Sequence, residues 1–336
     1  MVALYITSLE RGSGKTAICA GLGKHLLGDG KKVGFFKPII ADSKNQSTEG
    51  SDSDVAFIKH LFALEETVDL LCPVFSAGSG LTNKIKEAYA KVSQDKDVVI
   101  VEGVSEQSQA SRDIVEALDA RVVIVEDFSK ELLKAINSYK DVAGNLLGVV
   151  LNKVPRSRLE QVRGEASTQF DKAEVNILGV LPEDRTLFTL TIGELAERIQ
   201  GEILSGAEKS TELVENFMVG AMIVDPGPDY FARKANKAAV VNSGRPDIQL
   251  AALETSTRCL VLTGNTTPNS VVIYRAEEKD VPIILARDDT TTIVTNIEDA
   301  LGKTRFSGES KLPKLTEIME QHFNFQTVYK GLGLAS

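Results

Sequence analysis

The chain opens with Val2-Ala3-Leu4-Tyr5-Ile6-Thr7-Ser8-Leu9-Glu10-Arg11-Gly12-Ser13-Gly14-Lys15-Thr16. The apolar residues 2–8 predict a strand, and the residues after Thr16 have the spacing of an amphipathic helix. Gly12 and Gly14 let the backbone between these elements turn its amide groups inward, and the start of the helix adds partial positive charge. The segment therefore predicts an α/β fold with a phosphate-binding loop after its first strand.

The loop also carries side chains suited to a nucleotide and its metal ion. Lys15 is expected to be exposed and to reach the terminal phosphates, and the Thr16 hydroxyl can ligate Mg²⁺. Leu9 stands where the usual motif has its first glycine. The alternative interpretation is an ordinary glycine-rich turn with an exposed lysine. We expect the nucleotide to be bound by Gly12, Ser13, Gly14, Lys15, Thr16 and Ala17.

Up to about residue 200 the sequence repeats one theme, in which a β-branched run is followed by a turn and a longer segment with helical spacing. This alternation predicts a parallel sheet. Val98–Val101 and Val122–Val125 are continuously apolar, which indicates strands covered by helices on both faces. The expected strands lie near residues 2–8, 32–37, 97–102, 121–126, 146–152 and 175–181.

Three charged residues are expected at the carboxyl ends of these strands, the edge at which parallel sheets bind ligands. Lys37 ends the second strand, Asp54 opens a helix, and Glu102 follows Val98–Val101. Their charges suit phosphate groups and Mg²⁺. The alternatives are a helix cap for Asp54 and a solvated loop acid for Glu102. Because the three residues occur together, we expect them to be functional.

A second alternation of strands and helices follows an exposed connection. Residues 201–215 mix small and charged side chains, which favours a domain boundary there. We therefore expect a first domain at residues 1–205 and a smaller α/β domain at 215–325. The second domain is expected to have strands near 217–224, 237–242, 258–263 and 281–286, helices near 228–235, 246–256, 269–279, 293–301 and 312–323, and a frayed end at 330–336.

Length and composition limit the classes of function. A chain of 336 residues exceeds the roughly 250–300 residues at which single cores stop growing, so two domains are expected. The net charge of −9 opposes nucleic-acid binding. No segment approaches the ~18 uninterrupted apolar residues of a membrane span, and no secretion signal follows Met1, so we expect a soluble cytoplasmic protein. Three isolated cysteines give neither a disulfide framework nor metal-ligand spacing.

The first domain combines the motifs Gly14-Lys15-Thr16, Phe36-Lys37-Pro38, Asp54, Val101-Glu102-Gly103, Asn152 after Gly148-Val149-Val150-Leu151, and Leu178-Gly179-Val180-Leu181-Pro182. With these motifs the sequence resembles the dethiobiotin synthetase superfamily, and more closely the N-terminal region of long phosphotransacetylases. The resemblance implies a P-loop NTPase-type parallel sheet, with helices on both faces, that binds ATP. It implies that Lys15 and Lys37 contact phosphates or a substrate anion. It also implies that Asp54 and Glu102 hold Mg²⁺.

By the same resemblance, Asn152 and Pro182 border the adenine. The sequence departs from dethiobiotin synthetases at Val104-Ser105-Glu106-Gln107, where those enzymes have a Gly-Ala-Gly-Gly run after the strand acid. This departure weakens the case for dethiobiotin synthesis. The acyltransferase domain of long phosphotransacetylases would begin where this sequence ends, so we do not expect phosphotransacetylase activity from the chain by itself.

The second domain carries the motifs Val219-Gly220-Ala221-Met222, Gly244-Arg245-Pro246-Asp247-Ile248-Gln249, Leu253-Glu254-Thr255, Leu262-Thr263-Gly264, Val281-Pro282 and Asp289-Thr290. It is similar to the DRTGG domain that follows the same region in phosphotransacetylases. Gly244 replaces the aspartate of the naming motif. Arg245 and Asp247 lie in a loop that opens a helix, which suits a small anionic ligand. The alternative is that they are a cap and a surface residue.

Two functions of different classes fit these features. In the one that we favour, the chain binds ATP and Mg²⁺ or hydrolyses ATP slowly, and the second domain senses a small anionic ligand or mediates assembly into a homo-oligomer. In the other, Lys15 and Lys37 stabilise phosphoryl transfer from ATP to a carboxylate or carbamate, as in a ligase. A third interpretation, an assembly partner with a relic loop, is opposed by the intact Gly14-Lys15-Thr16.

Overall fold

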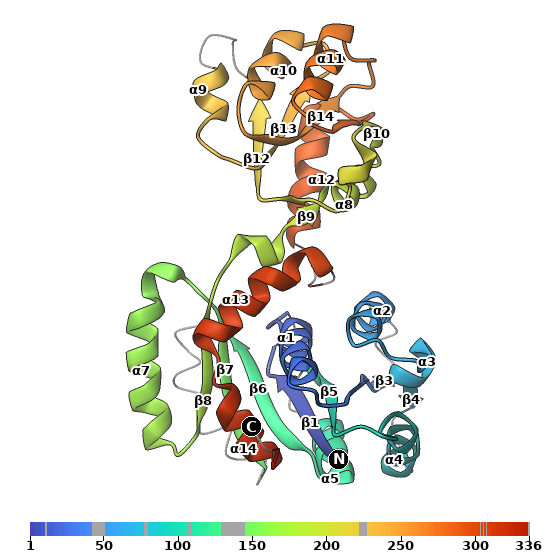
Figure 1. Ribbon diagram of the computed structural model, residues 1–336, viewed down its shortest axis with the longest axis vertical. Coiled ribbons are helices and arrows are strands. Elements are labelled where there is room, and N and C mark those ends of the chain that lie inside the picture. The colour runs from blue at the N-terminus through green and yellow to red at the C-terminus, as the bar shows by residue number, and fades with distance from the viewer. Residues whose placement is uncertain are drawn as a thin grey trace. The chain divides into compact units, whose positions relative to one another are not determined.

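The computed structural model describes residues 1–10, 12–41, 51–76, 80–105, 109–128, 145–221, 227–302, 304, 306 and 308–334. The chain divides into two compact units. The first comprises Met1–Asp184 together with Phe306–Ser336, and the second comprises Arg185–Arg305. In Figure 1 the first unit therefore contains both the blue-to-green elements and the red C-terminal helices. The second unit is an insertion into the first.

The first unit is built on a six-stranded parallel sheet of order β2-β5-β1-β6-β7-β8. Its strands are β1 Val2–Ser8, β2 Val33–Phe36, β5 Val98–Ser105, β6 Arg121–Asp127, β7 Leu146–Val154 and β8 Ile177–Pro182. Along β1 and β6 nearly every side chain is buried, as expected for strands covered on both faces. The predicted parallel α/β sheet is confirmed.

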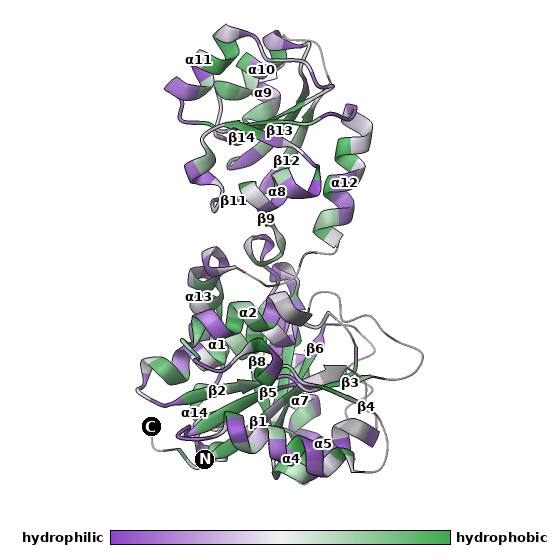
Figure 2. Ribbon diagram, turned by 90° about the vertical axis from the view of Figure 1, so that its right-hand side faces the viewer, coloured by the Kyte–Doolittle hydropathy of each residue, from purple (hydrophilic) through white to green (hydrophobic). Residues whose placement is uncertain are grey.

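Helices cover both faces of this sheet (Figure 2). On one face lie α1 (Lys15–Gly28) and α13 (Leu312–His322), which pack so closely that a Cβ on Gly21 would lie 2.1 Å from Met319 Sδ. The opposite face carries α4 Leu81–Val92, α5 Gln109–Leu118 and α7 Leu159–Lys172. The other elements of the unit are β3 Ile39–Ala41, α2 Ser51–Leu61, α3 Val68–Leu71, β4 Val74–Ser76 and α14 Phe325–Leu332.

The second unit has a five-stranded sheet of order β10-β15-β14-β13-β12. Four strands are parallel, and the edge strand β10 runs antiparallel to β15. One cluster of buried side chains packs α8 and α12 on one face, and another packs α9, α10 and α11 on the other. The elements are α8 Ile192–Arg198, β10 Glu202–Ser205, β12 Asn216–Gly220, α9 Gly227–Phe231, β13 Lys237–Asn242, α10 Pro246–Leu253, β14 Thr257–Thr263, α11 Ser270–Glu278, β15 Ile283–Leu285 and α12 Thr290–Gly302, with a small antiparallel pair of β9 Leu190–Thr191 and β11 Leu213–Val214.

The expected domain limits, 1–205 and 215–325, differ from this division. Residues 202–205, expected in an exposed connection, form β10 and pair with β15 of the second sheet. The helical segment expected at 312–323 forms α13, which packs on α1 in the first unit. Residues 330–332, expected to be frayed, end α14. Residues 222–224 of one expected strand, and Glu106 and Gln107, lie outside the described residues.

Within the described parts of the chain, no helix combines the length and the apolar character that crossing a lipid bilayer requires.

Candidate functional site

The phosphate loop joins β1 to α1, and two glycines shape it. Gly12 and Gly14 have φ values of 80° and 96°, in the left-handed region that other residues rarely adopt. A Cβ on Gly14 would lie 2.3 Å from Asn152 Nδ2, so only glycine fits there. Gly14 is the N-cap of α1 and gives it no side-chain cap. The amides of the first turn therefore remain suited to an anion.

Two side chains at the end of β7 bind the backbone of this loop. Asn152 Nδ2 donates a hydrogen bond of 2.8 Å to the carbonyl oxygen of Ser13. Lys153 Nζ donates to the carbonyl oxygen of Gly12 at 2.6 Å and pairs with Asp127 Oδ2 at 2.8 Å. Lys153 has φ of 56°, a left-handed conformation that costs a lysine about 1–3 kcal/mol. The strained backbone conformation places the Lys153 side chain where it can reach the loop.

Asn152 and Pro182, the two residues expected to border the adenine, occupy different places. The Asn152 amide contacts the loop backbone, as described, so its position is beside the phosphates' loop. Pro182 is the last residue of β8 and lies opposite Val154 of β7. Whether either borders a base stays a prediction from the resemblance. Ala17, expected to bind nucleotide, is buried in the first turn of α1.

Lys15 is buried, with an exposed fraction of 9%, and so differs from the exposed lysine that the sequence led us to expect. Its Nζ donates to Ser8 Oγ at 2.9 Å. Burial lowers the pKa of Lys15, although nearby Glu102 opposes the shift. A cation partly stripped of water gains strongly when a phosphate oxygen replaces the lost solvent.

Lys37, Asp54 and Glu102 come together at the same edge of the sheet. Lys37 Nζ lies 3.2 Å from Asp54 Oδ2 and 3.1 Å from Glu102 Oε1. The Thr16 hydroxyl donates to the same Glu102 oxygen at 3.0 Å. Burial lowers the pKa of Lys37, but the two carboxylates outweigh it, and the net pKa is raised. Lys37 therefore stays a cation that holds both acids, and Glu102 is not a solvated loop acid.

These residues fit a magnesium ion. The Thr16 hydroxyl and the Asp54 and Glu102 carboxylates offer oxygen, the donor that Mg²⁺ prefers. Glu102 Oε2 is buried and has no hydrogen-bond partner among the described residues. The same part of the chain contains no group of three or more His, Cys, Asp and Glu side chains that could hold a metal. Two carboxylates and a hydroxyl suit an ion that is held jointly with phosphate oxygens.

Glu126 and Lys153 belong to this site but were not predicted. Glu126 follows the buried run Val122–Val125 of β6, just as Glu102 follows Val98–Val101 of β5. Its Oε1 accepts a hydrogen bond of 2.6 Å from the amide of Leu9. The rule that found Glu102, an acid at the end of an apolar strand, would also have found Glu126.

Residues 2–189, more than half of the chain, match the AAA domain family. The chain belongs to this family. Residues 194–300 match the DRTGG domain and lie within the second unit. The AAA domain is of the dethiobiotin synthetase-like P-loop kind, and with the DRTGG domain it corresponds to the N-terminal region of long phosphotransacetylases, as the motifs implied.

Curated relatives agree with this assignment. The chain is 23% identical to a phosphate acetyltransferase of Nitratidesulfovibrio vulgaris, over 96% of this chain and 50% of that protein. It is 28% identical to the ATP-dependent dethiobiotin synthetase BioD of Caldicellulosiruptor saccharolyticus, over 31% of this chain and 48% of that protein. The chain spans about half the length of these relatives. Among solved structures, the MinD cell division protein of Aquifex aeolicus is similar with a TM-score of 0.38 and 20% identity, over 56% of this chain and 84% of that one.

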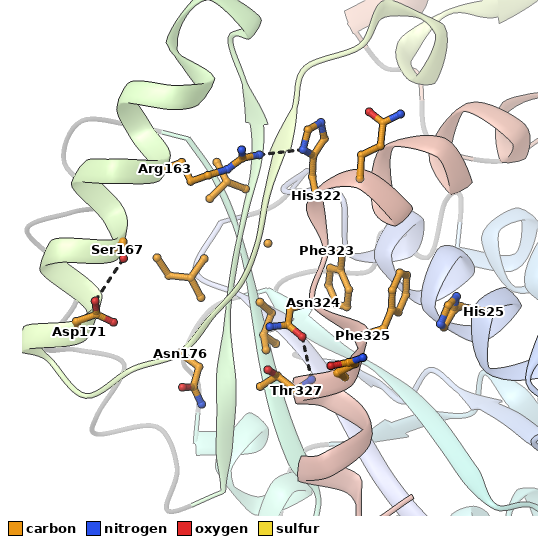
Figure 3. A pocket seen from close by; sticks show the side chains of 16 residues that line it. His25, Arg163, Ser167, Asp171, Asn176, His322, Phe323, Asn324, Phe325 and Thr327 are labelled. Atoms are coloured by element: carbon orange, nitrogen blue, oxygen red, sulfur yellow. Dashed lines mark hydrogen bonds between the residues drawn. The ribbon is translucent and has the colours of Figure 1, made fainter. Parts of the chain in front are cut away.

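The first unit also has a cavity of about 880 Å³ beside β8, lined by residues of α1, α7, β8, α13 and α14 (Figure 3). Arg163 Nη2 lies 2.9 Å from His322 Nδ1, and Arg163 Nη1 pairs with Glu160 at 3.0 Å. Burial and the adjacent arginine lower the pKa of His322, which disfavours its charged form. No phosphate-loop residue lines the cavity. Because Arg163 is already paired with Glu160 and bonded to His322, the cavity offers little positive charge to bind an anion.

In the DRTGG domain the two charged side chains of the predicted anion loop pair with each other. Arg245 Nη2 lies 2.7 Å from Asp247 Oδ2 at the start of α10. Through this hydrogen bond Asp247 raises the pKa of Arg245, and Arg245 lowers the pKa of Asp247. The amide of Gly244 donates to Asn242 Oδ1 at 2.8 Å. An anion reaching Arg245 must therefore compete with a neighbouring carboxylate.

Proposed function

We propose that the AAA domain binds ATP together with Mg²⁺ at the phosphate loop, and that the chain is a regulatory nucleotide-binding protein. The observation that carries this proposal is the 3.0 Å hydrogen bond between Thr16 Oγ1 and Glu102 Oε1. It joins the loop suited to phosphates to the acid suited to the metal ion. The relative named an ATP-dependent synthetase supports ATP as the nucleotide.

Each residue of the site has a task in this proposal. The loop amides and Lys15 bind phosphate oxygens, while Asn152 and Lys153 fix the loop backbone. Lys37 holds the two acids in place. Thr16, Asp54 and Glu102 would hold Mg²⁺, which when bound neutralises phosphate charge.

Calorimetric titration of the full chain tests the proposal. ATP, ADP and GTP are each added with Mg²⁺ and again in the presence of a chelator. We expect ATP to bind, and to bind more tightly with Mg²⁺. If none of the nucleotides binds a folded chain at millimolar concentration, the proposal is wrong.

A ligase-type enzyme is the second candidate, and Lys37 favours it. This half-buried cation lies beside Glu102 and Asp54 at the sheet edge, where it could stabilise charge on a phosphorylated carboxylate or carbamate. Phosphate release from ATP, measured with and without a panel of small carboxylic acids, separates the two candidates. An acid that stimulates release many-fold would favour the enzyme, whereas slow release unaffected by any acid favours the regulatory protein.

The replacement Glu102→Gln is expected to remove the advantage that Mg²⁺ gives to ATP binding. The amide keeps the shape and can still accept from Thr16, but it loses the charge that attracts the ion. We expect ATP affinity with Mg²⁺ to fall about tenfold or more, with a smaller change in chelator. Asp127→Asn is the matched control, because Asp127 is an acid at the end of another strand of the same sheet, β6, and pairs with Lys153 rather than with Lys37 or Thr16. Equal losses with and without Mg²⁺ would assign Glu102 to folding instead.

For the second unit we propose a small-ligand or assembly role at the carboxyl ends of its parallel strands. Arg245→Ala should weaken binding of a phosphate- or carboxylate-bearing ligand about tenfold or more, since charge-assisted hydrogen bonds are lost. Asp247→Asn should strengthen the same binding, because it removes the competing carboxylate. Inorganic phosphate, nucleotides and metabolic acids are the probes, measured by calorimetry on the full chain with Lys15→Ala to silence the first unit. If none binds and Arg245→Ala dissociates an oligomer in light scattering, the role is assembly.

A further inference from the structure

Two acids flank the strand that leads into the phosphate loop. β1 lies between β5 and β6, which carry Glu102 and Glu126 after their apolar runs Val98–Val101 and Val122–Val125. Their partners differ. Glu102 faces the cation Lys37, whereas Glu126 Oε1 accepts from the neutral amide of Leu9 at 2.6 Å. One acid is therefore compensated by a positive charge, and the other is bonded to the loop backbone itself.

Glu126 is almost completely buried, with 3% of its surface exposed. Among the described residues, the charged groups around it are Glu10 and Lys15 on the loop side and Asp127 on its own strand; the Asp127 carboxylate pairs with Lys153 of β7. Burial raises the pKa of Glu126 to about 7; the Leu9 amide opposes this shift and Glu10 adds to it. Lys15 lowers the pKa of Glu126, but burial outweighs this effect, and Lys15 Nζ itself donates to Ser8 Oγ.

We propose that Glu126 is a positioning residue of the phosphate loop and that its carboxyl group takes up a proton when a nucleoside triphosphate binds. This inference rests on the proposed ATP binding. The triphosphate brings negative charge to a loop whose amide is held by Glu126, and a nearby like charge disfavours an ionised carboxylate. A protonated carboxyl group still accepts from the Leu9 amide through its carbonyl oxygen, so the loop keeps its support.

The sign of the pH dependence follows from this linkage. A ligand that raises the pKa of an acid binds best when the acid is already protonated. ATP affinity is thus highest below a pH of about 7 and falls as the pH rises through the pKa of the free protein. With a pKa of about 7, the affinity at pH 8 is about tenfold lower than at pH 6.

The test is calorimetry of the full chain with ATP in excess Mg²⁺, at pH 6, 7 and 8. At pH 8 it is repeated in two buffers of different ionisation enthalpy, which gives the number of protons taken up. We expect up to about 0.9 proton per ATP at pH 8, since a group of pKa about 7 is then mostly ionised in the free protein. Glu126→Gln keeps an acceptor for Leu9 without a titrating charge. It should abolish this uptake, flatten the pH profile and bind ATP about tenfold more tightly than the wild type at pH 8.

Two further variants separate charge from position. Glu126→Ala removes the acceptor for the Leu9 amide and should bind ATP more weakly than Glu126→Gln at every pH. Glu10→Gln, which removes an exposed acid from the same loop, should keep the proton uptake. Uptake by Glu126→Gln equal to that of the wild type, or equal affinities of the alanine and glutamine variants, overturns the proposal.

The wild type alone also decides the matter if a variant does not fold. ATP binding without proton uptake overturns the role of Glu126 and leaves the proposed function intact. A wild-type chain that binds no ATP overturns both.

Discussion

Replacing Lys15 with alanine is expected to lower the affinity for ATP about a hundredfold or more. The lysine is buried beside the loop amides and donates to Ser8 Oγ. A bound phosphate would offer it charge-assisted hydrogen bonds worth about 1.5–3 kcal/mol each, and two of these correspond to a hundredfold or more. Calorimetric titration with ATP and excess Mg²⁺ measures the effect.

The variant should remain folded, because removing a cation from a buried position also removes the cost of keeping it there. Circular dichroism and thermal melting check this. Lys24→Ala is the matched control, since Lys24 lies on the same helix α1 but is exposed. An Lys15→Ala protein that is folded and binds ATP as tightly as the Lys24→Ala protein would contradict the proposed site.

Deleting residues 306–336 is expected to prevent the first unit from folding. Nine apolar side chains in the described part of this segment are buried: Phe306, Leu312, Leu315, Ile318, Met319, Phe323, Val328, Tyr329 and Leu332. Burying one such side chain contributes about 1.5–3 kcal/mol, so together they rival the total stability of about 5–15 kcal/mol of an ordinary protein. Urea unfolding of fragment 1–305, followed by circular dichroism and by ATP binding, tests this expectation.

The same deletion should spare the second unit. Residues 185–305 contain both buried clusters of the five-stranded sheet, so this fragment is expected to unfold cooperatively by itself. Deletion of residues 333–336 alone is the control, because α14 ends at Leu332. If fragment 1–305 bound ATP and melted like the full chain, the packing of α13 on α1 would contribute little.

Features with a local signal could be predicted from the sequence. Two central strands could be predicted from the apolar runs Val98–Val101 and Val122–Val125. A strand that is buried on both faces is apolar at every position, which distinguishes it from a strand at the surface. Lys37 and Glu102 were placed at one edge because parallel strands end together. The 3.1 Å contact between them agrees with that reasoning.

Features that depend on partners far away in the sequence could not be predicted from it. β10 is short and half-exposed, and only its pairing with β15, about 80 residues later, makes it part of a sheet. α13 had a recognisable helical pattern, but nothing in that pattern says that its apolar face fits against Gly21 of α1. The brace by Lys153 depends on a left-handed backbone that lysine does not favour.

The insertion of the second unit also bears on how the chain folds as it is synthesised. Domains generally fold as units while the chain emerges from its N-terminal end. Here Arg185–Arg305 is complete before α13 and α14, the last helices of the first unit, have been made. The helix α1, which follows the phosphate loop, would thus leave the ribosome before the inserted unit and yet be covered by α13 only after it. A chain released early would hold one finished unit and a first unit without α13 and α14, exposing the surface of α1 that α13 covers.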